Sequence, residues 1–198
     1  MSYAKTLLEL SGADLTPARL GEACLVLIDY QNEYLEGPLA LPGAALAVDE
    51  AGRLLDSARA AGTPVIHVAH RGREGGLFDR DAHRGAIIDL LAPKAGERVI
   101  EKPLPNAFAQ TGLDAELAAT GRRKLIVAGF MTHMCVSATT RAALDQGFMS
   151  TVAADACASR DLPDGTGGTI SAAEVHRVAL AELADRFAIV ARGDWMVD

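Results

Sequence analysis

Cys135, Asp29 and Lys102 are the residues whose chemical types could together carry out covalent catalysis. A thiol is a nucleophile, a carboxylate can accept the thiol proton, and a lysine ammonium can stabilise the anions that form. Asp29 follows the apolar run 25–28, and Lys102 follows the run 99–101. A charged group at the end of a buried strand is costly unless it is paired or lies at a crevice. Whether the three side chains meet depends on the fold.

Cys135 follows an apolar run through a short turn and opens a helical pattern that continues toward Gln146. Backbone N–H groups and the helix dipole at such a position favour a thiolate, and the same N–H groups could hold an oxyanion. The alternative is that Cys135 is a small buried apolar residue, which is the preferred interpretation for Cys24 and Cys157. Asp155 ends another apolar run and is an alternative base, although either aspartate could simply cap a loop.

Six short apolar runs alternate with helical patterns along the chain. Most of the runs are continuous and do not alternate between polar and apolar residues, which is typical of parallel strands covered on both faces. The expected strands are Cys24–Asp29, Pro64–His70, Arg98–Lys102, Lys124–Phe130, Met149–Asp155 and Phe187–Ala191.

The intervening segments have helical spacing, and most end at a glycine. The expected helices are Ala44–Ala61, Leu113–Ala119, Val136–Gln146 and Ala172–Arg186, while Arg71–Arg84 and Ala158–Gly168 are expected to be irregular. This alternation predicts an α/β fold, a three-layer αβα sandwich. In such sheets the ligand crevice lies beyond the carboxyl ends of the strands.

Length and composition indicate an ordinary globular domain. The chain has 198 residues, of which 49% are hydrophobic and 23% are charged, and its formal net charge is −7. This composition excludes a disordered protein, and the absence of a basic cluster argues against a nucleic-acid partner. The apolar runs are too short to span a bilayer, and the first eleven residues lack a signal-peptide pattern. Three widely spaced cysteines do not form a disulfide framework, so we expect a reduced, cytoplasmic protein with a single domain over residues 1–198.

Three motifs carry a resemblance to a known family. The sequence LIDYQNEY at 27–34, EKPLPNAF at 101–108 and GFMTHMCV at 129–136 resemble, in this order, the motifs of isochorismatase-like cysteine hydrolases. The segment 155–160, with His176 and the Ala179-Leu180 pair, also follows the family pattern. The resemblance covers about residues 22–192.

The resemblance implies a doubly wound, Rossmann-like sheet of six parallel strands in the order 3-2-1-4-5-6. It also implies that Asp29 is the general base, Lys102 the stabilising cation and Cys135 the nucleophile. A cis peptide bond is implied between Phe130 and Met131, together with an oxyanion hole made by the N–H groups of Met131 and Cys135.

The substrate is less well defined by the sequence. Nicotinamidases of this superfamily carry a metal-binding Asp-x-His motif, whereas this chain has His67-Val68-Ala69-His70 at that place. Two histidines three residues apart on a strand face opposite sides, so we expect no metal. The glycine-rich segment 165–168 lacks the residues of a P-loop, so no nucleotide or other cofactor is expected.

The presence of Cys135 favours hydrolysis of an amide-type C–N bond in a small molecule through an acyl-cysteine. The alternatives are an isochorismatase-type vinyl ether hydrolase that uses the aspartate alone and a catalytically silent binding protein. A flavodoxin-like cofactor binder is a third possibility, because fold alone does not settle function.

Residues near the expected strand ends are candidates for the substrate pocket and for subunit contacts. The base rate for symmetric oligomers and the resemblance both favour a homodimer or homotetramer, with no nucleic-acid or membrane partner. The candidate pocket residues are Gln31, Phe78, Phe108, Thr132 and His133, and the candidate interface residues are Tyr30, Tyr34 and Trp195.

Overall fold

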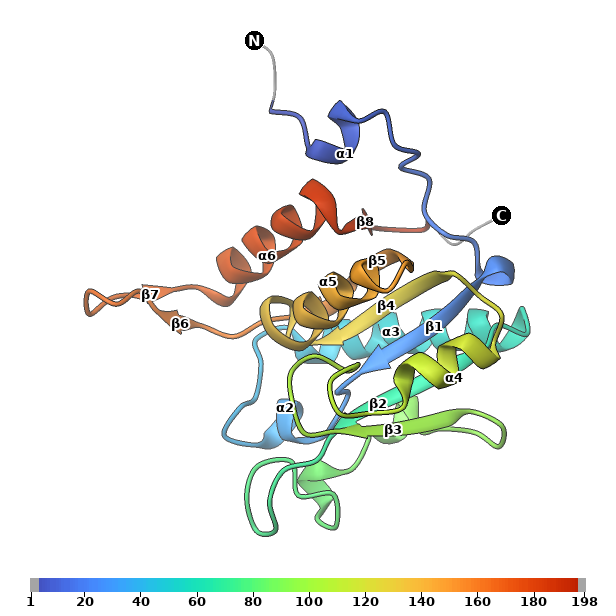
Figure 1. Cartoon of the computed structure of the whole chain (residues 1–198). Coiled ribbons are helices and arrows are strands. Elements are labelled where there is room, and N and C mark those ends of the chain that lie inside the picture. The colour runs from blue at the N-terminus through green and yellow to red at the C-terminus, as the bar shows by residue number, and fades with distance from the viewer. Residues whose placement is uncertain (1–3, 196–198) are drawn as a thin grey trace.

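A six-stranded parallel sheet forms the centre of the computed structural model, which describes residues 4–195 (Figure 1). Its strand order is β3-β2-β1-β4-β5-β8, and all neighbouring strands are parallel. The strands are β1 (Ala23–Ile28), β2 (Val65–His70), β3 (Arg98–Lys102), β4 (Lys124–Phe130), β5 (Met149–Ala158) and β8 (Ala188–Ala191).

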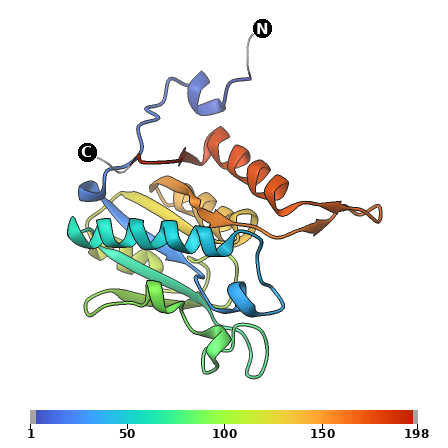
Figure 2. The ribbon, with the colours of Figure 1, turned by 180° about the vertical axis from the view of Figure 1, so that it is seen from behind.

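Helices cover both faces of this sheet and make the expected three layers. Helix α3 packs on one face, where its apolar side chains join a core cluster with Leu25, Leu27 and Ile126 (Figure 2). Helices α4, α5 and α6 pack on the other face, around Val26, Val127 and other strand residues. The helices are α1 (Leu7–Leu10), α2 (Glu33–Glu36), α3 (Ala44–Ala60), α4 (Leu113–Ala119), α5 (Ser137–Asp145) and α6 (Ala172–Arg186).

The predicted order 3-2-1-4-5-6 is confirmed, with β8 as its sixth strand. The labels β6 and β7 belong to two short strands outside this sheet, β6 (Leu162–Pro163) and β7 (Thr169–Ile170). They pair antiparallel in and directly after the segment 158–168, which was expected to be irregular. This hairpin projects from the body of the molecule, as both ribbon views show. Strand β5 continues past Asp155 to Ala158, because a register shift opposite β4 brings Cys157 beside Gly129.

Gly129 allows β1 and β4 to approach each other closely at their carboxyl ends. Its φ is +146°, and a Cβ built at this position would lie 2.1 Å from the carbonyl oxygen of Ile28. No other residue fits without a backbone shift. The close approach places the residues that follow β1 next to those that follow β4.

Two of the three expected interface residues are internal, so that prediction is wrong for them. Tyr30 and Tyr34 are only 2% and 3% exposed, and their rings pack against the ring of Phe130. Both belong to the core beside α3, and neither can contact another subunit. Trp195 is half-buried and packs against the same core cluster.

No helix within residues 4–195 has the length and apolar character that crossing a membrane requires.

Candidate active site

Asp29, Lys102 and Cys135 meet at the carboxyl ends of the sheet. The Nζ atom of Lys102 lies 2.8 Å from Oδ2 of Asp29 and 3.3 Å from Sγ of Cys135. Asp29 and Lys102 have no exposed surface, and Cys135 is 5% exposed. The three side chains whose types suggested covalent chemistry therefore form one buried cluster.

Each of the three is positioned by the end of a different strand. Asp29 follows β1 with φ +55°, and its N–H donates to the carbonyl of Val68 in β2 at 2.8 Å. Lys102 is the last residue of β3, so its side chain reaches past β2 toward β1 and β4. Its ammonium also donates to the carbonyl of Leu104 at 3.1 Å. The side chain thus has three partners on three segments.

Cys135 lies in a wide turn and not in the first turn of α5, as the helical pattern had predicted. Residues Thr132–Val136 form a π-helical turn in which the N–H of Val136 reaches the carbonyl of Met131 at 3.3 Å, and α5 begins only at Ser137. Such widened turns are often found at functional sites. The turn directs the thiol toward Lys102.

The expectation that the helix terminus would favour a thiolate is not met in this arrangement. Burial and the neighbouring Asp29 carboxylate raise the pKa of Cys135 to about 12, against the opposing effect of Lys102. Burial also raises the pKa of Cys24 and of Cys157 to about 12. Cys135 is therefore distinguished by its neighbours, since the other two thiols have no lysine beside them in the described residues. It needs a base to remove its proton.

Asp29 has the properties of such a base. Burial raises the pKa of its carboxyl group, although the Lys102 ammonium opposes the shift. The ion pair with Lys102 at 2.8 Å is the main interaction of this carboxylate, and a hydrogen bond with the Cys135 thiol also affects its pKa. A raised pKa makes a stronger base, and the thiol is the neighbour whose proton it can accept.

The peptide bond between Phe130 and Met131 is cis, as the resemblance implied. It lies directly before the turn that carries Cys135. The assignment of the Met131 and Cys135 N–H groups to an oxyanion hole stays a prediction.

Phe78 lies beside this cluster, while Phe108 has a core contact. The Phe78 ring is buried against the rings of Tyr34 and His70, with centroid distances of 5.1 and 5.2 Å. Burial and the Lys102 charge lower the pKa of His70, which places it near the cluster as well. Phe108 is half-buried and stacks on Phe148 with centroids 6.2 Å apart.

Gln31 and Thr132 have structural partners, and their expected contact with the substrate stays a prediction. The Gln31 amide accepts from the N–H of His70 and donates to the carbonyls of His70 and Gly85, at 2.8 to 2.9 Å. The Thr132 hydroxyl bonds the carbonyl of Ala158 at 3.1 Å and the His176 ring at 2.8 Å. Both side chains hold the scaffold around the cluster together.

His133 has one ring nitrogen without a partner in the described residues. Its Nδ1 contacts the hydroxyl of Ser159 at 3.1 Å, while Nε2 is buried and has no partner within the described residues. A buried nitrogen of this kind needs a hydrogen bond from something that binds there.

Tyr34 and Arg160 are site residues that sequence reasoning missed. The Tyr34 ring packs against Phe130, the residue before the cis bond. Burial raises its pKa most, the charges of Asp29 and Cys135 add to this, and Arg160 acts in the opposite direction. Arg160 also lowers the pKa of His133, after the larger effect of burial. Its Nε is buried without a partner among residues 4–195. Both lie in segments that carry the family resemblance, 27–34 and 155–160, but neither was named as a pocket residue.

His67 and His70 behave as two separate residues, as their spacing predicted. His67 is buried and its Nε2 lies 2.9 Å from Oε2 of Glu97, while His70 contacts Phe78. Within residues 4–195, no three His, Cys, Asp or Glu side chains are grouped so that they could hold a metal ion.

Comparison with known proteins agrees with this fold. The family model for the isochorismatase domain matches residues 23–194. The crystal structure of an isochorismatase from Pseudomonas putida KT2440 superimposes with a TM-score of 0.92 and 47% identity, covering 96% of this chain and 97% of that one.

Two curated relatives extend the comparison. A secreted isochorismatase effector of Verticillium dahliae is 38% identical over 177 residues, which are 89% of this chain and 90% of the relative. Maleamate amidohydrolase of Pseudomonas putida is 32% identical over 153 residues, which are 69% of this chain and 72% of the relative.

The family match and the relatives that it includes define the class of the protein as a hydrolase. The chain belongs to the isochorismatase family.

Proposed function

We propose that the protein hydrolyses an amide-type C–N bond of a small molecule through a covalent acyl-cysteine. The observation that carries the proposal is the buried contact of Lys102 with both the Asp29 carboxylate and the Cys135 thiol. A catalytically silent protein would not be expected to keep three costly polar groups buried together. The relative named maleamate amidohydrolase supports the amide class.

The proposed reaction begins with attack of the thiol on the carbonyl carbon. The S–C bond forms while the thiol proton passes to Asp29, and the carbonyl electrons move onto the oxygen. The N–H groups of Met131 and Cys135 hold that oxyanion, and the Lys102 ammonium balances the charge nearby. When the oxyanion collapses, the C–N bond breaks and Asp29 returns the proton to the leaving amine.

Hydrolysis of the thioester completes the cycle. Asp29 takes a proton from a water molecule, whose oxygen attacks the acyl carbon. The S–C bond then breaks, the sulfur recovers its proton, and the acid is released. One water is consumed for each C–N bond that is cleaved.

A panel of small primary amides with ammonia detection tests this proposal. We expect Cys135→Ser and Asp29→Asn to lower kcat/KM by about a thousandfold or more, because residues that act as a unit are each essential. Cys24→Ala is the matched control, since Cys24 is buried on β1 without contact to the cluster. Intact-mass spectrometry of a slow substrate should show an acyl adduct on Cys135.

The vinyl ether alternative gives a different result in the same assay. An isochorismatase-type reaction through Asp29 alone would survive Cys135→Ser and be lost in Asp29→Asn. No turnover of any amide or vinyl ether by the wild type would favour a silent binding protein.

We further propose that the substrate carries an anionic group that Arg160 recognises. The charge of Arg160 lowers the pKa of both Tyr34 and His133. Its Nη1 donates to the carbonyl of Asp161 at 3.3 Å, while its buried Nε has no partner among residues 4–195. Charged hydrogen bonds contribute about 1.5–3 kcal/mol, so Arg160→Met should raise KM about tenfold or more for an amide with a carboxylate. A neutral amide of similar size should be unaffected, and Arg177→Met on the exposed side of α6 is the matched control. Equal losses for both amides would contradict this role.

The cytoplasmic location stays a proposal, since the thiol must remain reduced to act. The described residues contain three free cysteines, but the relative from Verticillium dahliae is named a secreted effector. Fractionation of the producing cells would test the location.

A further inference from the structure

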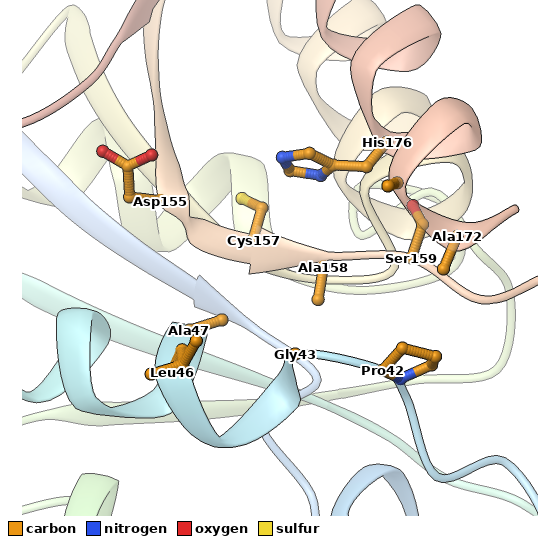
Figure 3. A pocket seen from close by; sticks show the side chains of 11 residues that line it. Pro42, Gly43, Leu46, Ala47, Asp155, Cys157, Ala158, Ser159, Ala172 and His176 are labelled. Carbon is orange, nitrogen blue, oxygen red and sulfur yellow. The ribbon is translucent and has the colours of Figure 1, made fainter.

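A second cavity lies apart from the catalytic cluster. It has a volume of about 360 Å³ and opens between the start of α3, the end of β5 and the start of α6 (Figure 3). A neighbouring hollow of about 460 Å³ shares four of its lining residues. These are Leu46, Asp155, Cys157 and His176. Asp29, Lys102 and Cys135 line neither space.

His176 presents a hydrogen-bond acceptor to this cavity. With the Thr132 hydroxyl donating to the carbonyl of Ala158 at 3.1 Å, the 2.8 Å contact with His176 is assigned to Nδ1–H as the donor. In a neutral imidazole the other nitrogen, Nε2, is then an acceptor. Burial lowers the pKa of His176, which keeps the ring neutral near pH 7.

The charges around the two spaces are mostly negative. Asp155 lines both, and Asp49 and Glu50 line the second, where Arg53 pairs with Glu50. Asp155 accepts the N–H of Gly193 at 2.7 Å and lies 3.6 Å from Arg192, yet its side chain stays 44% exposed. A ligand here meets carboxylates and a histidine acceptor, so it should be a hydrogen-bond donor with positive charge.

The opposite wall is apolar. Leu46 is 73% exposed on α3 and faces the cavity together with Ala47, as Figure 3 shows. A side chain of this size gains free energy when a ligand covers it. We therefore expect the ligand to have an apolar part that covers Leu46, opposite its hydrogen-bond donor.

Cys157 adds a thiol to the wall but not a second nucleophile. Its Sγ donates to the carbonyl of Ala153 at 3.3 Å, and burial keeps its pKa near 12. The cavity is thus suited to reversible binding.

We propose that this cavity is a binding site for a small organic ammonium compound with an apolar body, separate from the catalytic cluster. The ammonium donates to Nε2 of His176 and to the Asp155 carboxylate, and the apolar part covers Leu46. The bound molecule lies one hydrogen bond from the nucleophile turn, because His176 contacts Thr132 and Ser159 contacts His133.

Calorimetric titration with cyclohexylmethylammonium chloride in phosphate buffer tests the site. Cyclohexylmethanol is the neutral probe of the same shape. We expect the ammonium to bind with a Kd of about 1 mM or tighter, and the alcohol to bind at least about tenfold more weakly. Added salt should weaken only the ammonium, because its attraction is electrostatic.

Two variants locate the bound probe. Leu46→Lys places a positive charge at the cavity and should weaken ammonium binding about fivefold or more. Val178→Lys is the matched control, since Val178 is an exposed apolar residue of α6 that does not line the cavity. The affinity should be unchanged in Val178→Lys and in Cys135→Ser. Circular dichroism checks that each variant is folded.

Several outcomes would overturn the proposal. These are equal binding of the ammonium and the alcohol, no binding of either, or an unchanged affinity in folded Leu46→Lys. If the affinity is lost in Cys135→Ser but kept in Leu46→Lys, the probe binds at the catalytic cluster and not in this cavity. Absence of binding together with a lower oligomer mass for Leu46→Lys would make this surface a contact between copies of the chain.

Discussion

Lys102 is the residue on which the chemistry of the site depends most. Its fully buried ammonium stabilises the carboxylate of Asp29 and contacts the thiol of Cys135, so a change in its charge alters the proton affinity of both. The sequence predicted a base, a cation and a nucleophile at positions 29, 102 and 135, because residue types and family motifs are enough to name such roles. It could not predict that Cys135 would remain a thiol, since that depends on how completely the folded chain excludes water.

The pH dependence of the reaction follows from Asp29. Only the ionised carboxylate accepts the thiol proton, and burial raises its pKa, so kcat/KM should fall with decreasing pH at a value above the ordinary pKa of about 3.9. Lys102→Met removes the opposing charge, so the fall in its residual activity should move to higher pH. Rate profiles between about pH 4 and 9 measure both. A fall at the ordinary aspartate value would contradict the role of Asp29 as a buried base.

The same ion pair affects stability. Lys102→Met leaves a buried carboxylate without its partner and should lower the free energy of unfolding in urea by about 3 kcal/mol or more. Asp29→Asn combined with Lys102→Met should recover most of this loss, because the amide is neutral and asparagine tolerates the left-handed backbone at position 29. A double variant less stable than Lys102→Met alone would count against this explanation.

At the scale of elements, the periodic segments were predicted well, and the exceptions are segments without a regular apolar pattern. The strand and helix patterns have one local cause, the burial of apolar side chains, so the sequence shows them directly. The turn 132–136, the hairpin β6–β7 and the extension of β5 have tertiary causes. The structural partners of Gln31 and Thr132 could not be predicted from the sequence, because they come from distant segments of the chain.

Gly129 permits a test at this scale. Gly129→Ala would push a methyl group to within 2.1 Å of the Ile28 carbonyl and separate β1 from β4. We expect a loss of about 3 kcal/mol or more in the free energy of unfolding, measured by urea denaturation. Gly112→Ala, which has open space around it, should change stability by less than about 1 kcal/mol. Similar stabilities for the two variants would show that the close approach is not required.

For the whole molecule, the sequence predicted the class of fold, and the proposal of a homodimer or homotetramer stays open. Tyr30 and Tyr34 are buried and take no part in subunit contacts. The projecting hairpin β6–β7 has strands of only two residues, and such a hairpin has marginal stability unless other residues cover it. Sedimentation equilibrium should give two or four times the 20.7 kDa of one chain. A mass of 20.7 kDa at micromolar concentration would contradict the expectation.

Lys102 extends from β3 past β2 to β1 and β4. The cluster therefore also indicates whether these strands of the sheet have paired. Residues 29, 102 and 135 are brought together only when strands from both halves of the chain have paired, and such non-local pairing is slow relative to helix formation. The nucleophile can therefore be protected and activated only at the end of folding. Pulsed alkylation of Cys135 during refolding would measure when that last step occurs. A chain with a partly formed sheet would have no hydrolase activity.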